Sequence, residues 1–164
     1  MDALVLGILL YFSENLNHMN SFVLILHSAN RFILLALLLL VIVRAFNGWQ
    51  KKSAFEATDN KLGLFLFIST HTQLLLGLIL YFISPAVVFS GESMKDSVAR
   101  YWLVEHISGM FIAIVLITMA RITAKKMTDD TAKHKRLFTF NLLALVIVAA
   151  MIALSHRGFF TVTW

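Results

Sequence analysis

The stretch SFVLILHSANRFILLALLLLVIVRAF, residues 21–46, decides the fold. A helix needs about 20 apolar residues to cross the hydrocarbon core of a bilayer, and this stretch is that long and shows no alternation typical of a strand. Three further stretches of the same kind follow it. The sequence therefore predicts an all-α, four-helix transmembrane bundle with helices at about 21–46, 62–83, 98–122 and 137–156.

The composition agrees with a membrane protein. Of 164 residues, 59% are hydrophobic and only 14% charged, and the mean hydropathy is +0.82. Soluble domains are about 45–50% apolar and about 25% charged. The chain has no cysteine, which excludes disulfides, thiolate zinc sites, iron–sulfur clusters and covalently attached haem. Six histidines remain as possible metal ligands.

Lysine and arginine predict the orientation, because cytoplasmic loops are enriched in both. The two segments that join helices one to two and three to four carry ten of these residues: Arg44, Lys51, Lys52, Lys61, Arg121, Lys125, Lys126, Lys133, Lys135 and Arg136. The opposite side carries three, Lys95, Arg100 and Arg157. We therefore expect both termini outside the cytoplasm of a bacterial inner membrane. The net charge of +5 reflects topology and not nucleic-acid binding.

The first twenty residues are apolar at their start, MDALVLGILLYF, but too short to span a bilayer. They lack the basic beginning and small-residue cleavage site of a signal peptide. We therefore interpret residues 1–20 as a segment at the membrane interface and residues 21–164 as the four-helix membrane domain.

Histidines stand at similar depths in three of the predicted helices. At about 1.5 Å of rise per residue, His27 lies ~25 Å and His106 ~22 Å from the arginines that mark the cytoplasmic edge. His71 lies ~15 Å from that edge by the same count. Polar residues inside a membrane are costly and usually functional, so these three residues are the candidate ligands.

A b-type haem fits this pattern, because its iron takes two axial imidazoles from facing helices of a bundle. His27 and His106 form the best pair by depth, and His71 is the alternative in place of either one. Arg31 follows His27 by one helical turn and shares its face, where it would neutralise a haem propionate. Gly109 would let a flat ring approach the backbone of the third helix.

Structural roles remain open for the same residues. Each histidine alone is as well explained by a structural hydrogen bond as by ligation. Arg31 and Glu105 could form an interhelical ion pair, and the polar block 69–73 could join helices by hydrogen bonds. His134 lies in the basic run KHKR and is interpreted as a solvated residue.

The segments LHSANRF, DNKLGLFLFISTHTQLLLGLILYF, VEHISGMFIAIVLI and AKHKRLF resemble a family of small four-helix membrane proteins of Bacteroidota-type bacteria called cytochrome b-like. The resemblance covers about residues 21–140. It implies haem b and electron transfer, with His27, His71, Glu105 and His106 at the positions of the family pattern. The long N-terminal extension departs from that family.

Three functional hypotheses follow. The first is a b-type haem protein that transfers electrons in the bilayer, as a subunit of a respiratory or other membrane complex, with a quinone as a candidate partner. The second is an accessory or assembly subunit without its own cofactor, bound to other membrane subunits or to a second copy. The third is a metal or proton site formed by His27, His71, Glu105 and His106. No motif for nucleophilic catalysis or nucleotide binding is present.

Overall fold

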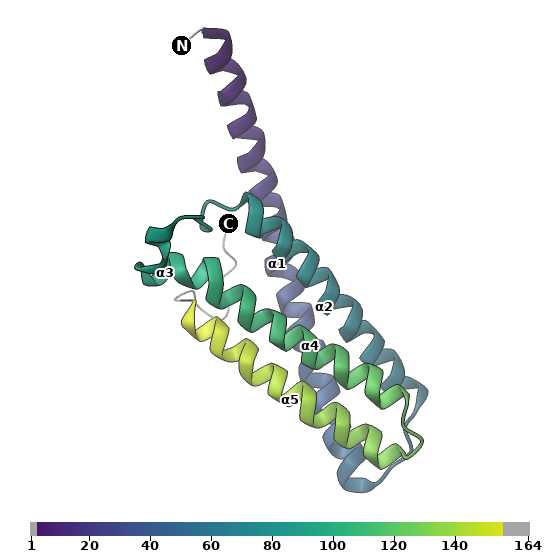
Figure 1. Cartoon of the computed structure of the whole chain (residues 1–164). Coiled ribbons are helices and arrows are strands. Elements are labelled where there is room, and N and C mark those ends of the chain that lie inside the picture. Colours follow the sequence, from purple (N-terminus) through teal and green to yellow (C-terminus); the bar gives the residue numbers. More distant parts are fainter. Residues whose placement is uncertain (1–2, 156–164) are drawn as a thin grey trace.

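The computed structural model describes residues 3–155, and these residues contain helices and no strand. The four long helices of this range are α1 (Ala3–Lys51), α2 (Ala57–Ile83), α4 (His106–Lys125) and α5 (Asp130–Leu154). A connection of short elements joins α2 to α4: the 3-10 turn η1 (Gly91–Met94), the helix α3 (Ser97–Arg100) and the π-helical turn η2 (Tyr101–Glu105). Figure 1 shows the antiparallel course of the long helices.

The described residues include four helical stretches long and apolar enough to cross a membrane: Leu4–Lys51, Ala57–Ile83, Ser97–Lys125 and Asp130–Leu154. The predicted all-α fold with four such helices is therefore confirmed. The helices extend past the predicted apolar stretches because polar residues cap their ends. Asp129, for example, accepts a hydrogen bond from the backbone N–H of Ala132 and starts α5 seven residues before the first apolar residue expected. His156 lies outside the described residues.

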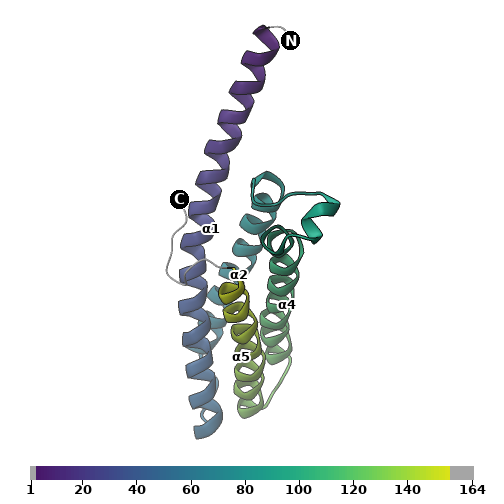
Figure 2. The same ribbon diagram turned by 90° about the vertical axis from the view of Figure 1, so that its left-hand side faces the viewer.

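Helix α1 differs most from the prediction, because residues 3–51 form one helix of 49 residues without a boundary near residue 20. Such a helix is about 73 Å long, whereas a hydrocarbon core is about 30 Å thick. Its N-terminal part projects beyond the other helices (Figures 1 and 2). The change from apolar to polar residues near Ser13 suggested a break, but this stretch contains no proline to end a helix.

The long helices form a four-membered ring. Helix α1 packs against α2 and α5, and α4 packs against α5 and α2. Figure 2 shows α1 and α4 on opposite sides, with α5 and α2 between them. Helix α4 buries four small residues, Gly109, Ala113, Ala120 and Ala124. Small residues at a helix interface allow the neighbouring helices to approach closely. Helices α1 and α4 are thus diagonal partners across the bundle.

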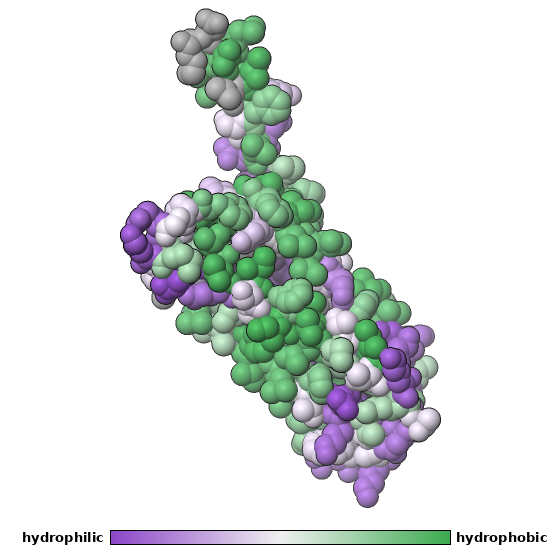
Figure 3. All heavy atoms as spheres, viewed as in Figure 1, coloured by the Kyte–Doolittle hydropathy of each residue, from purple (hydrophilic) through white to green (hydrophobic). Residues whose placement is uncertain are grey.

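The bundle exposes apolar side chains and buries polar ones. Phe82 is 74% exposed and Val146 60%, whereas Thr70 is 0% and Asn141 1% exposed. Figure 3 shows hydrophobic residues across the middle of the molecule and hydrophilic ones towards its ends. In water such a surface would be costly, but lipid tails accept it without cost. The distribution therefore matches a bundle surrounded by lipid.

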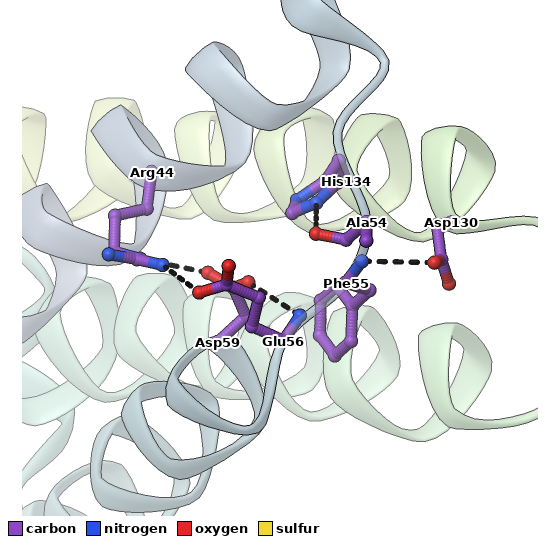
Figure 4. A network of polar contacts seen from close by, with 7 residues as sticks. All are labelled: Arg44, Ala54, Phe55, Glu56, Asp59, Asp130 and His134. Atoms are coloured by element: carbon purple, nitrogen blue, oxygen red, sulfur yellow. Dashed lines mark hydrogen bonds and ion pairs between the residues drawn. The ribbon is translucent and has the colours of Figure 1, made fainter.

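The end of the bundle where α2 and α5 begin is fixed by ion pairs and backbone hydrogen bonds (Figure 4). Arg44 donates through Nε to Asp59 Oδ1 at 2.8 Å, and its Nη2 lies 3.6 Å from Glu56 Oε2. The backbone N–H of Phe55 donates to Asp130 Oδ2 at 3.0 Å. The contacts of Arg44 join α1 to the start of α2. The hydrogen bond of Phe55 joins the α1–α2 loop to the first turn of α5.

His134 is buried at this end, so its interpretation as a solvated residue was wrong. It is 2% exposed, its ring lies 5.2 Å from the Phe55 ring, and its Nε2 is 3.5 Å from the carbonyl oxygen of Ala54. The period of the helix explains why this histidine turns inward. His134 begins the series of buried residues of α5 that continues with Leu137, Asn141, Ala144 and Val148. The neighbouring basic residues of the run lie on other faces of the helix.

Gly48 makes room for this histidine, which gives a stability prediction. A Cβ at Gly48 would lie 2.5 Å from His134 Nδ1 and Cε1, so Gly48→Ala should destabilise the protein by about 1–3 kcal/mol through overpacking. The change would lower the unfolding temperature in detergent, measured by scanning fluorimetry.

Gly7→Ala is the matched control, because a Cβ at Gly7 has nothing within 4 Å. It should leave stability unchanged or raise it slightly, since alanine favours helix over glycine. An unfolding temperature for Gly48→Ala at or above that of the unmodified protein would contradict the packing described for His134.

Candidate functional site

A hydrogen-bonded layer joins α1 to α2 inside the bundle. Asn30 Nδ2 donates to Gln73 Oε1 at 2.7 Å and to the carbonyl oxygen of Ser69 at 2.9 Å. Ser69 Oγ donates to Asn30 Oδ1 at 3.0 Å, and Gln73 Nε2 donates to the carbonyl oxygen of His27 at 3.0 Å. Part of the polar block 69–73 thus joins two helices by hydrogen bonds, which confirms one of the alternatives predicted from the sequence. The layer also fixes the rotation of α1 next to His27.

The His27 ring is half-buried and faces α2. Its Nε2 lies 3.4 Å from the position that a Cβ on Gly77 would occupy. The imidazole lies within electrostatic reach of His106 and of Arg31. Since α1 and α4 are diagonal in the ring of helices, His27 and His106 come from opposite sides of the bundle.

His106 begins α4 directly after the π-helical turn, and Tyr101 orients it. The Tyr101 hydroxyl lies 3.1 Å from His106 Nδ1 and donates to the carbonyl oxygen of Met151 on α5. A hydroxyl has one proton, and the Tyr101 hydroxyl donates it to the carbonyl oxygen of Met151. The Tyr101 oxygen can therefore only accept a hydrogen bond from His106, whose Nδ1 carries the proton. The lone pair of the imidazole is then on Nε2. This is the arrangement by which proteins orient a metal-ligating histidine.

The π-helical turn explains why Tyr101 reaches His106. Residues five apart in an α-helix do not face each other, but a π turn places them one above the other. Tyr101 is 3% exposed, and the rings of Tyr101 and Trp102 lie 5.7 Å and 5.3 Å from the His106 ring. This contact was not predicted from the sequence. No signal in the sequence marks a π turn here.

His71 lies against its own helix. Its Nδ1 is 2.9 Å from the carbonyl oxygen of Phe67, and the centres of the two tilted rings lie 4.1 Å apart. These contacts hold its ring along α2. The structure therefore places His27 and His106 within electrostatic reach of each other and gives His71 a local partner.

The charged candidates take different positions. The Arg31 guanidinium lies 4.9 Å from the centre of the Phe32 ring and interacts with His27. Glu105 accepts a hydrogen bond from Arg100 Nε at 2.7 Å, so it has an ionic partner close to it in the sequence, and its pairing with Arg31 stays a prediction. Arg100 is five residues before Glu105, and the π turn again brings the two side chains together.

Gly109 has a different use from the one expected. A Cβ there would lie 2.5 Å from Met151 Sδ, so the glycine makes room for a methionine of α5. Among residues 3–155, no three histidine, aspartate or glutamate side chains come together as a metal site. What this end of the bundle offers chemically is a pair of imidazoles with an arginine beside them.

No family model, curated protein or solved structure matches this chain. The site is therefore interpreted from its own residues.

The hydrogen bond with Tyr101 predicts which ring nitrogen of His106 carries the proton. In the detergent-solubilised protein, ¹⁵N NMR of the histidine rings should show His106 protonated at Nδ1 and unprotonated at Nε2. Tyr101→Phe removes the acceptor, so we expect a mixture of tautomers and a loss of about 1 kcal/mol of stability.

Tyr81→Phe is the matched control, because the Tyr81 hydroxyl donates to the carbonyl oxygen of Leu103 at 3.1 Å and not to a histidine. It should cost similar stability and leave the His106 signals unchanged. A His106 ring already protonated at Nε2 in the unmodified protein would rule out the role described for Tyr101.

Proposed function

We propose that this chain is a membrane protein that binds a b-type haem between His27 and His106 and transfers electrons within the bilayer. The proposal rests on the placement of two histidines on diagonal helices of a four-helix bundle, within electrostatic reach of each other. Haem sites of helical bundles are built from such side chains on facing helices. Haem b, when bound, supplies a one-electron redox centre.

The residues around the pair suit such a ligand. His106 has its lone pair on Nε2 when Tyr101 holds its Nδ1 proton, which is the form that binds iron. Arg31, beside His27, carries the positive charge that a propionate requires. The seam between α2 and α4 is less closely packed than the other three seams of the ring, so it is the side where a flat group enters with the least loss of packing.

The surroundings define the class of electron partner. The connections outside the long helices are short, with residues 52–56 and 126–129 on one side and 84–96 on the other. A partner therefore meets the protein mainly through lipid, as a quinone or as another membrane subunit does. The resemblance to cytochrome b-like proteins supports the same proposal, including a bacterial inner membrane with the basic end in the cytoplasm.

One observation favours the second function, an accessory subunit of a larger complex. The N-terminal part of α1 lies outside the bundle and exposes large apolar residues, Leu4, Leu6, Ile8, Leu10, Tyr11 and Phe12. Helices that expose such faces usually associate with others. Co-purification of a defined membrane complex after mild solubilisation, lost on deletion of residues 2–12, would support this function, and it is compatible with haem binding.

The haem proposal predicts a spectroscopic difference between histidine variants. The purified protein should show the reduced-minus-oxidised spectrum of b-type haem and a pyridine haemochrome. His27→Ala and His106→Ala should each lose at least about tenfold in haem occupancy, because each removes an axial ligand.

His71→Ala is the control, because His71 bonds to its own helix, and it should retain haem. Circular dichroism would check that all three variants stay helical. A protein purified from haem-replete cells without haem would disprove the proposal. Loss of haem in His71→Ala together with retention in His106→Ala would move the site to His71.

A further inference from the structure

A cavity of about 310 Å³ lies at the opposite end of the bundle from His27 and His106. Its walls come from the first turns of α2, the last turns of α4 and the beginning of α5. Part of its rim, with Phe55, Glu56 and Asp59, is drawn in Figure 4. It is therefore a second feature of the molecule, independent of the proposed haem site.

The acidic residues of this cavity already have cationic partners. Arg44, which comes from α1, pairs with both Asp59 and Glu56. One of the three basic residues of the lining, Lys133, pairs with Asp130 at 2.7 Å. Each of these carboxylates thus has a cationic partner within the protein, with Glu56 and Asp59 sharing Arg44.

Two cations of the lining, Arg121 and Lys125, have no acidic partner among residues 3–155. Arg121 donates from Nη1 to the carbonyl oxygen of Asn60 at 3.1 Å, and a guanidinium has further donors to offer. With Arg44 and Asp130 included, four cations stand against three carboxylates at the cavity, so it has an excess of about one positive charge, which an anion would balance.

Arg121 is held in place and is not a freely moving surface residue. It is half-buried, and its Nη1 lies 3.2 Å from the position of a Cβ on Gly63. The absence of a side chain at Gly63 allows the guanidinium to lie against α2, where Asn60 fixes its direction. A fixed guanidinium recognises phosphate better than a mobile one, because its planar donors match phosphate oxygens.

The remaining wall is apolar, formed by Phe55, Ala124, Met127 and Leu137. The cavity lies at the ends of membrane-spanning stretches, the depth at which lipid head groups join their acyl chains. Fixed positive charge beside an apolar wall at this depth matches the phosphate and glycerol of a phospholipid. We propose that this cavity binds the phosphodiester head group of an anionic phospholipid through Arg121 and Lys125.

Native mass spectrometry of the detergent-solubilised full chain tests the proposal. The protein is titrated with phosphatidylglycerol, with phosphatidylcholine and with inorganic phosphate as a competitor. We expect phosphatidylglycerol to bind more tightly than phosphatidylcholine, and Arg121→Gln to weaken it by about tenfold, since one charge-assisted contact is lost. Lys125→Gln should also weaken it, and because Lys125 is exposed, this variant decides the question if Arg121→Gln does not fold.

Lys135→Gln is the matched control, because this lysine lies over the Trp49 ring at 5.5 Å and does not line the cavity. It should bind phosphatidylglycerol as the unmodified protein does. Equal weakening in Lys135→Gln would overturn the proposal in favour of general surface charge, and so would equal binding of the two lipids. Displacement of phosphatidylglycerol by an equal concentration of inorganic phosphate would assign the cavity to a free anion and overturn the lipid assignment.

Discussion

The hydrogen bonds of Asn30 with Ser69 and Gln73 hold α1 and α2 together where lipid provides no other partner. In water these side chains would exchange one partner for another, but in hydrocarbon an unpaired amide is costly. The layer therefore sets both the depth and the rotation of α1 against α2. The position of His27, whose carbonyl oxygen accepts from Gln73, depends directly on it.

The two ends of the bundle use polar groups in different ways. At one end, carboxylates and arginine form ion pairs that close the loops, and a buried histidine fills space beside Gly48. At the other end, Tyr101 orients His106, and His27 lies half-buried within electrostatic reach of it. The carboxylates of the first end are all paired with cations. The imidazoles of the second end are the groups suited to bind a metal, and for this reason we place the proposed redox site there.

Much of the fold could be predicted from the sequence, because apolar length is a strong local signal of membrane-spanning helices. The orientation that lysine and arginine indicate, and the pairing of His27 with His106 by depth, stay predictions. The side-chain contacts of the site could not be predicted, because they depend on the rotation and register of the helices and hydropathy carries no information about either. A π turn placed Tyr101 on His106 and Arg100 on Glu105, and helical period turned His134 inward. Continuity of α1 was missed because polar residues after Phe12 resemble the end of a helix.

The length of α1 has a mechanical consequence. From Asn30, where α2 holds the helix, to Ala3 is about 40 Å along a single uninterrupted rod. A tilt of about 10° at the held point would move the far tip by roughly 7 Å, since displacement grows with distance along a rigid helix. Small changes of packing beside His27 are thus enlarged at the N-terminus of α1, far from the residues that cause them.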